Sequence, residues 1–337
     1  MFFIQLRDLF KSYGPVRALN GLNLEVPKGS LYGLLGPNGA GKSTALRIIC
    51  TLLEPDSGHV EVGGRDALLE EKETRRRLGY VAQEVAIDKI LTGRELLQLQ
   101  GDLYHLDNKY KRKRIEELIE RLDMHEWIDR RCGSFSGGMK RRLDLASGLL
   151  HEPELLILDE PTVGLDIESR SVIWGLLKEL SNNETTILLS SHYLEEVDEL
   201  ADEMAIIDKG KVIANGKPDD LKKELGGDRV TLRVREFSDK VEAESVRKLV
   251  KNINGVSNVV VNQKQGYSLN FLVQNNDVLA NLPEHLSKEN FEVFALSHSR
   301  PSLDDVYLQA TGKTLMDAEL ELAGQRDFKL ENKKSMR

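Results

Sequence analysis

The chain has 337 residues, a length that suggests one large globular domain and a smaller one. Its formal net charge of −8 gives no overall basic field, so neither nucleic acid nor an anionic membrane is expected as the main partner. The two cysteines lack metal-ligand spacing, and no apolar run approaches the roughly eighteen residues of a membrane span, so we expect a cytoplasmic protein in a reducing compartment.

The first 35 residues read as short strands separated by turns. Residues 4–6 and 22–26 alternate between apolar and polar side chains, which predicts two strands, and residues 11–15 are typical of a turn. Tyr13 lies in this turn, where its ring could stack on an adenine or simply stand at a loop tip. We therefore expect the chain to begin with a β-rich lobe.

A glycine-rich segment lies between an apolar run at residues 31–35 and a helical run at 45–49. It fits the phosphate-loop spacing of glycine, four residues, glycine, lysine, and serine or threonine. The glycines let backbone amides converge on phosphate oxygens at the start of a helix, and the lysine and serine can bind the outer phosphates and Mg²⁺. The predicted cradle residues are Gly36, Asn38, Gly39, Gly41, Lys42, Ser43 and Thr44.

A further strand and then a helical region follow the cradle. Residues 78–83 form a short predicted strand that ends at Gln83. From about residue 92 to residue 150 the apolar spacing becomes helical, beginning with a capping box of Thr92 and Glu95. The sequence therefore predicts an inserted helical lobe, at about residues 85–150.

Two basic clusters, at residues 111–114 and 140–142, fall within this lobe. Each cluster is short and is flanked by acidic residues or by helical pattern. We expect both to lie on solvated helix faces rather than to bind nucleic acid.

Two acidic residues follow a continuous apolar run at residues 155–158, which is typical of a strand buried on both faces of a parallel sheet. Asp159 could hold Mg²⁺ and Glu160 could accept a proton from an attacking water, although adjacent acids can also simply begin a turn. After a helical stretch, a second buried strand at residues 186–191 ends at His192. This histidine is either structural or a contact of the terminal phosphate.

The composition shifts near residues 222–228, where we place a domain boundary. The elements expected beyond it are strands at residues 230–234, 258–262, 267–273 and 291–296 and helices at 242–250 and 278–286. The order βαββαβ suggests a small α+β ferredoxin-like domain. We therefore expect domains at 1–225 and 228–312, and a short helix and mobile tail at 313–337.

In order and spacing, the motifs of residues 2 to about 220 resemble those of the nucleotide-binding subunit of an ATP-binding cassette (ABC) transporter, an α/β P-loop NTPase fold. Ser136, Gly137 and Gly138 resemble the family signature, with Phe135 and Met139 in place of the commoner leucine and glutamine. These two replacements leave the serine and glycines that contact phosphate unchanged.

The resemblance also assigns roles to residues noted above. It implies ATP and Mg²⁺ as cofactors, with catalysis by Glu160, His192 and Lys42. It places Ser43, Gln83 and Asp159 around the metal. The further nucleotide contacts that it implies are Tyr13, Gln83, the D-loop residue Asp166, and Ser136 to Gly138.

In this family the signature of one subunit closes over ATP held by another. The resemblance therefore implies an ATP-hydrolysing exporter subunit that forms a homodimer and sits on the cytoplasmic face of the membrane through separate transmembrane permease subunits. The alternative is a soluble ABC ATPase acting on a cytosolic macromolecule such as the ribosome. No nucleic-acid partner is otherwise expected.

Residues 228–312 resemble the accessory C-terminal domain of daunorubicin-resistance-type exporter ATPases, especially at residues 300–308. There Ser302 and Asp305 predict a capping box at the start of a helix that presents Val306 and Leu308 for packing. Both an assembly clasp and a regulatory site remain open as roles for this domain.

Overall fold

The computed structural model describes residues 1–337 except 183, 236–237, 263–265, 275 and 322–337. The chain divides into two compact units, Met1–Asn215 and Gly216–Arg337. Helix α8 (Pro218–Glu224) packs on α11 (Leu303–Thr311), within the second unit. The boundary expected near residues 222–228 lies a few residues beyond this division, and the predicted mobile tail lies mostly outside the described residues.

The first unit begins with a four-stranded sheet in the order β2-β1-β4-β5. Its strands are β1 (Phe2–Tyr13), β2 (Val16–Pro27), β4 (Ser57–Val62) and β5 (Arg65–Asp66). The turn predicted at residues 11–15 is wrong, because β1 continues to Tyr13, which pairs directly with Val16. Only Gly14 and Pro15 connect the strands, and the positive φ of 57° at Gly14 permits so tight a hairpin.

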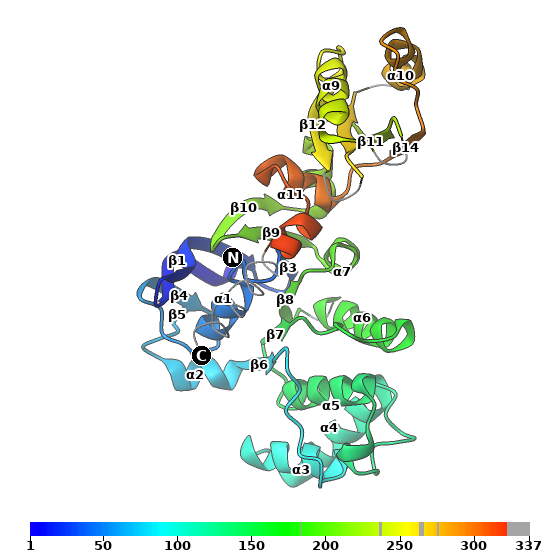
Figure 1. Ribbon diagram of the computed structural model, residues 1–337. Coiled ribbons are helices and arrows are strands. Elements are labelled where there is room, and N and C mark those ends of the chain that lie inside the picture. The colour runs from blue at the N-terminus through cyan, green and yellow to red at the C-terminus, as the bar shows by residue number, and fades with distance from the viewer. Residues whose placement is uncertain (183, 236–237, 263–265, 275, 322–337) are drawn as a thin grey trace, which may run out of the picture. The chain divides into compact units, whose positions relative to one another are not determined.

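The second sheet of this unit has six strands in the order β10-β9-β3-β8-β7-β6 (Figure 1). They are β3 (Leu31–Leu35), β6 (Leu78–Val81), β7 (Leu155–Asp159), β8 (Thr186–Ser191), β9 (Glu203–Asp208) and β10 (Lys211–Gly216). Strands β9, β3, β8, β7 and β6 run parallel to one another. Every residue of β3, β7 and β8 is buried, which confirms the predicted parallel core.

Helices of the first unit pack on this sheet and form a separate lobe between β6 and β7. They are α1 (Lys42–Ile49), α2 (Glu71–Arg77), α3 (Gly93–Leu103), α4 (Asn108–Arg121), α5 (Gly137–Leu149), α6 (Ile167–Asn182) and α7 (Leu194–Leu200). The capping box predicted for α3 is confirmed: Glu95 donates its N–H to Thr92 Oγ1 at 3.2 Å, and Thr92 donates its N–H to Glu95 Oε2 at 2.8 Å. The predicted inserted helical lobe therefore comprises α3, α4 and α5 (Figure 1).

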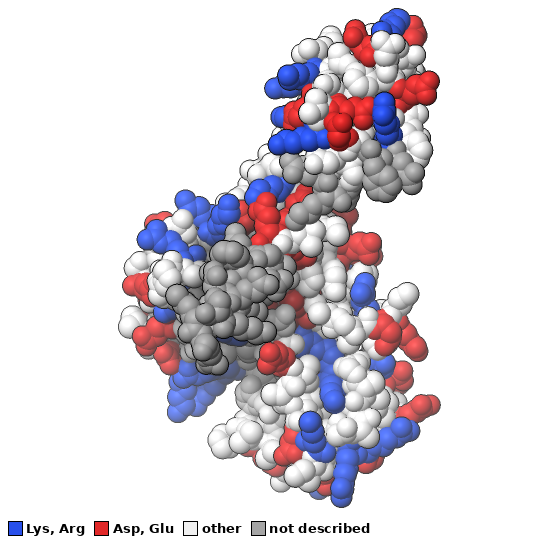
Figure 2. Space-filling model, viewed as in Figure 1, with Lys and Arg blue, Asp and Glu red and all other residues white. Residues whose placement is uncertain are grey.

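The prediction that the basic clusters lie on solvated faces is wrong for three of their members. Lys111, Arg114 and Arg141 are buried. Each finds oxygen acceptors: Lys111 bonds to Asp102, for example, and Arg114 donates to Leu149 O at 3.4 Å. Elsewhere on the lobe, Lys and Arg are interspersed with Asp and Glu (Figure 2). Helical periodicity alone did not show which cations face inward.

The second unit is a four-stranded antiparallel sheet in the order β12-β13-β11-β14, packed with two helices. These four strands and two helices are β11 (Asp228–Arg233), α9 (Lys240–Lys251), β12 (Val256–Asn262), β13 (Ser268–Val273), α10 (Asn276–Lys288) and β14 (Ala295–Ser299). This confirms the ferredoxin-like fold.

The last strand begins later than the predicted residues 291–296. Helix α10 extends to Lys288, and Asn290 then takes a positive φ of 64° while Phe291 donates its N–H to Leu286 O at 3.0 Å. This helix-ending turn uses the residues expected to start the strand.

Helix α11 follows the sheet and carries the predicted capping box. Ser302 donates both its N–H and its Oγ to Asp305 Oδ2 at 2.8 Å, and Val306 and Leu308 are buried. A second helical segment covers residues 315–321. Among the described residues, none of the helices is both long enough and apolar enough to span a bilayer.

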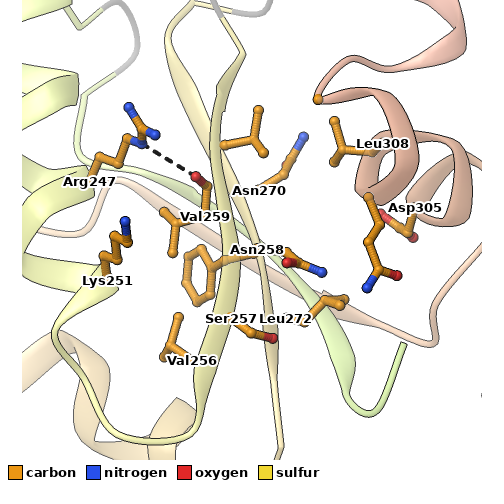
Figure 3. Close-up of a pocket in the computed structure, with 14 residues that line it drawn as sticks. Arg247, Lys251, Val256, Ser257, Asn258, Val259, Asn270, Leu272, Asp305 and Leu308 are labelled. Atoms are coloured by element: carbon orange, nitrogen blue, oxygen red, sulfur yellow. Dashed lines mark hydrogen bonds between the residues drawn. The ribbon is translucent and has the colours of Figure 1, made fainter. Parts of the chain in front are cut away.

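A cavity of about 410 Å³ lies in the second unit (Figure 3). Helix α9 contributes Arg247 and Lys251 to its wall, α11 contributes Asp305 and Leu308, and β12 runs between them. Arg247 is held there by a 3.3 Å hydrogen bond from Nε to Val259 O. All of its lining residues belong to the second unit, whereas every predicted ATP-site residue belongs to the first.

Candidate functional site

Parallel pairing brings the ends of four strands to one edge of the six-stranded sheet. Leu35 pairs with Ser191, and Asp159 pairs with Ser190, so β3, β8 and β7 end at the same level. The glycine-rich loop follows β3, His192 follows β8, Glu160 follows β7, and Gln83 comes shortly after β6. This edge is where open α/β sheets bind ligands.

The glycine-rich loop has a backbone that only glycine tolerates. Gly39 and Gly41 have φ of 80° and 112°, in the left-handed region. A Cβ on Gly36 would lie 2.3 Å from Ile207 O, and one on Gly41 would lie 2.6 Å from Ala18 O. Helix α1 starts directly after Gly41, so the loop presents backbone amides at a helix N-terminus, an arrangement that fits phosphate.

Lys42 is buried at the base of this loop. Its Nζ donates to Gly36 O at 2.6 Å and to Pro37 O at 3.3 Å, and it lies 3.6 Å from Glu160 Oε1. The ammonium group therefore already stands between the loop and the acidic strand end, where it can reach the outer phosphates of a nucleotide.

Ser43 and Asp159 offer oxygen ligands to a metal. Ser43 donates from Oγ to Asp159 Oδ1 at 3.1 Å, and Ser190 Oγ donates to the same oxygen at 2.6 Å. Asp159 is buried. A hydroxyl and a carboxylate fit Mg²⁺, which takes few protein ligands and completes its shell with phosphate and water. Gln83, which the resemblance places around the metal, donates to Glu160.

Glu160 is the centre of the cluster. Its carboxylate accepts a hydrogen bond from Gln83 Nε2 at 2.9 Å and lies 3.1 Å from His192 Nδ1. Burial alone would raise the pKa of Glu160, but the hydrogen bond with His192 and the charge of Lys42 outweigh burial and hold that pKa below its ordinary value. The side chain is therefore ionised at neutral pH and able to accept a proton.

The backbone of Glu160 is strained. Its φ is 50°, a left-handed conformation that is uncommon for a residue with a side chain. The N–H of Glu160 donates to Ser190 O at 3.1 Å and to Ser190 Oγ at 3.2 Å, which helps to hold this geometry. Strained residues of this kind cluster at functional sites.

Ser136 caps helix α5, and its Oγ accepts the N–H of Met139 at 3.2 Å. The thioether of Met139 in turn accepts the N–H of Ser136 at 3.4 Å, so methionine closes this capping box. A Cβ on Gly138 would lie 2.3 Å from Ser169 Oγ, whereas one on Gly137 would meet nothing within 4 Å. The start of α5 is therefore open to an incoming ligand on the Gly137 side.

Two other predicted nucleotide contacts are exposed. Tyr13 ends β1 with its side chain accessible. Asp166 accepts hydrogen bonds from Ser169 N at 2.8 Å and Ser169 Oγ at 3.1 Å, and these bonds hold the pKa of Asp166 below its ordinary value. Because Ser169 also abuts Gly138, the structure places Asp166 beside the signature helix. These described contacts do not join Tyr13 or Asp166 to the Glu160 cluster.

Two residues that no sequence motif marked, Ser190 and Arg141, also lie in the site. Ser190 bonds to both Asp159 and Glu160, and the signal for it was a serine pair ending an otherwise apolar strand. Arg141 donates from Nη2 to Asp159 O at 2.9 Å and from Nε to Pro161 O at 2.7 Å. Its position in a basic run on an amphipathic helix gave no such signal.

Comparison with known proteins matches each unit to a family. Residues 19–163 match the family described as ABC transporter, and residues 216–311 match the C-terminal domain of DrrA1-3-like ATP-binding proteins. The daunorubicin resistance ATP-binding protein DrrA3 of Streptomyces coeruleorubidus is 41% identical over 302 residues, which cover 90% of this chain and 93% of that protein.

Two further similarities extend this result. The Nod factor export ATP-binding protein I of Burkholderia orbicola is 37% identical over 230 residues, 68% of this chain and 76% of that protein. A bacterial ABC transporter cassette solved as a dimer superposes with a TM-score of 0.59 at 26% identity, covering 64% of this chain and 98% of the cassette. The chain belongs to the family of ABC transporter ATP-binding proteins, the ATPases that drive these transporters.

Proposed function

We propose that this chain hydrolyses ATP at the Glu160 cluster as one half of a homodimer, and so powers an exporter built from separate transmembrane subunits. The observation that carries the proposal is the convergence of Lys42, Gln83 and His192 on one buried, ionised carboxylate at the end of a parallel strand. That arrangement supplies a base, a cation and two polar groups at one point beside a phosphate loop.

Each residue then has a separate task. The amides of residues 36–44 and the ammonium of Lys42 bind the phosphates, and Ser43 and Asp159 hold Mg²⁺. The Mg²⁺ ion, when bound, neutralises charge on the outer phosphates. Glu160 accepts the proton of the attacking water, and His192 orients both the carboxylate and the terminal phosphate.

Dimerisation completes the site, because one phosphate loop leaves the terminal phosphate exposed to water. The start of α5, at Ser136 to Gly138, carries the partial positive charge of a helix N-terminus, roughly half an elementary charge. When it faces the phosphate loop of a second subunit, its amides add donors to the terminal phosphate. The open space around Gly137 and the dimeric state of the similar cassette support this arrangement.

Export is supported by the relatives, whose names state daunorubicin resistance and Nod factor export. Gln83 could couple ATP hydrolysis to the transmembrane subunits, since it contacts Glu160 and its segment leads into the helical lobe. We place the permease partners on that lobe, and the chain at the cytoplasmic face of the membrane. Tyr13 and Asp166 complete the nucleotide contacts, Tyr13 by stacking on the adenine.

Purification from detergent-solubilised membranes tests the transport role. The chain, tagged and expressed at its natural level, is captured and its partners are identified by mass spectrometry. A protein with several membrane spans should copurify, and its yield should not change when RNA is digested. Recovery of ribosomal proteins instead would favour the alternative of a soluble ABC ATPase that acts on the ribosome.

A further inference from the structure

Arg141 joins three parts of the first unit through one guanidinium group. The residue lies on α5 and is only 4% exposed. Its Nε donates to Pro161 O at 2.7 Å, its Nη2 donates to Asp159 O at 2.9 Å, and its Nη1 donates to Ala82 O. The signature helix is thereby bonded to the segment after β6 and to the end of β7.

The carbonyls that Arg141 bonds belong to residues next to Gln83 and Glu160, the two side chains that contact each other in the site. Ala82 directly precedes Gln83, and Asp159 and Pro161 stand on either side of Glu160. The left-handed conformation of Glu160 persists only if its surroundings hold it. Arg141 bonds the carbonyls on both sides of that strained residue, so it restrains the direction of the Glu160 side chain.

The shape of the guanidinium makes this restraint rigid. Its donors lie in one plane at fixed angles, so the carbonyls of the two segments are held at a fixed spacing. That spacing is the one at which Gln83 Nε2 meets Glu160 Oε2 at 2.9 Å. Asp144, one turn along α5, lies 3.4 Å from Nη1 and steadies the group from its own helix.

The same helix carries the signature at its start. Ser136 caps α5, and Arg141 follows about one turn after Gly137. A helix moves as a rigid rod over so short a distance. A displacement of Ser136 to Gly138 therefore displaces the guanidinium and, with it, the carbonyls beside Gln83 and Glu160.

We propose that Arg141 is a positioning residue that couples the signature segment of one subunit to the Gln83 and Glu160 of that same subunit. Contact of the signature with ATP bound to the partner then sets the hydrolytic geometry at the subunit's own ATP. Arg141 touches neither nucleotide. The inference rests on the proposed dimer and adds the link between its two ATP sites.

Steady-state ATP hydrolysis by the full chain tests the link. We expect Arg141→Lys and Arg141→Gln to lower kcat by about 10-fold or more while KM changes by less than about threefold, since the phosphate loop is untouched. We expect a Hill coefficient for ATP above 1 in the natural chain, and it should fall to about 1 in the variants because the sites no longer communicate. ATP binding measured on the monomer should not change.

A matched control separates positioning from the general cost of losing a buried arginine. Arg114 is 7% exposed and donates to Leu149 O, at the other end of α5. Arg114→Gln should lower the melting temperature as Arg141→Gln does but keep the natural kcat and Hill coefficient. The proposal is overturned if Arg141→Lys, folded by circular dichroism, keeps both parameters, or if Arg114→Gln loses both equally.

A second measurement distinguishes this inference from the dimer on which it rests. Glu160→Gln and the double variant Glu160→Gln with Arg141→Lys should both form dimers with ATP, because phosphate loop and signature are intact in each. If Glu160→Gln alone stays monomeric, the proposed dimer fails. If it dimerises while the double variant does not, Arg141 supports assembly rather than coupling, and the inference is overturned.

Discussion

Gln83 and Glu160 follow neighbouring parallel strands, and the Nε2 of Gln83 donates to Oε2 of Glu160 at 2.9 Å. The other carboxylate oxygen of Glu160 lies 3.1 Å from His192 and 3.6 Å from Lys42. Three different segments therefore fix one carboxylate. A movement of any of them changes the position of the group to which we assign proton transfer.

Glu160→Gln should slow ATP hydrolysis by about 100-fold or more, because an amide cannot accept the proton of water. ATP binding should persist, so the ATP-bound dimer should accumulate. Phosphate release and size-exclusion chromatography with ATP and Mg²⁺ measure the two effects, and ADP serves as the control nucleotide. Normal turnover in this variant would remove Glu160 from the role of base.

Ser136→Arg should abolish hydrolysis while the monomer still binds ATP, because the bulky cation blocks the open side of α5. Mixing this variant with Glu160→Gln tests whether each site is shared between subunits. Half of randomly formed dimers would contain one site with both an intact Glu160 and an intact signature, so at most about a quarter of the natural activity should return. Because that Glu160 lies in the subunit whose own signature is blocked, the proposed coupling through Arg141 should hold the recovery below this quarter. A mixture as inactive as its two components would contradict a shared site.

The acid limb of the ATPase pH profile should report the contact between His192 and Glu160. Burial pushes the pKa of Glu160 up, and His192 and Lys42 together bring it below the ordinary value. Removing His192 takes away one lowering contribution, so His192→Ala should shift the acid limb of kcat to higher pH, besides lowering kcat throughout. His125→Ala, at an exposed histidine bonded to Glu120, should leave the limb in place.

The sequence predicted those parts of the fold that depend on local chemistry. The phosphate loop, the capping boxes and the buried strand at residues 186–191 are each specified by adjacent residues, and the structure has them where they were expected. The predictions at Tyr13 and Phe291 were wrong, and they show what a local pattern cannot predict. In both places long-range pairing or a helix extension, rather than the local turn or strand pattern, determined the element.

The residues of the candidate site also fall into two groups, those that a local motif identifies and those that only the folded chain brings together. Lys42, Asp159 and Glu160 belong to short motifs with a defined spacing, so the sequence was enough to select them. Arg141 acts on carbonyls that are distant along the chain, at Ala82 and Pro161. Its acceptors are backbone atoms, which carry no side-chain pattern, and only the folded structure reveals them.

Ionisation of the Asp144 carboxyl should lower the free energy of unfolding as the pH rises. Burial raises the pKa of Asp144 to about 6, although the charge of Arg141 opposes this. The native state therefore binds the proton more tightly than the unfolded chain, and the stabilisation present below about pH 4 is lost as the pH rises through about 6.

Asp144→Asn should remove this dependence. The stability of the natural chain relative to the variant should fall by up to about 3 kcal/mol between pH 4 and pH 7. Urea unfolding of both proteins across that range measures the difference, in which the titrations of all other groups cancel. A difference that does not vary with pH would show that Asp144 titrates at its ordinary value.

Both cysteines are buried, and burial raises the pKa of the Cys50 thiol and of the Cys132 thiol above the ordinary value. Since the thiolate is the nucleophile, neither should react readily with maleimides while the chain is folded. The natural chain should therefore give little background in site-directed thiol labelling. Single cysteines placed at exposed positions would report distances between subunits, with no need to remove Cys50 or Cys132 first.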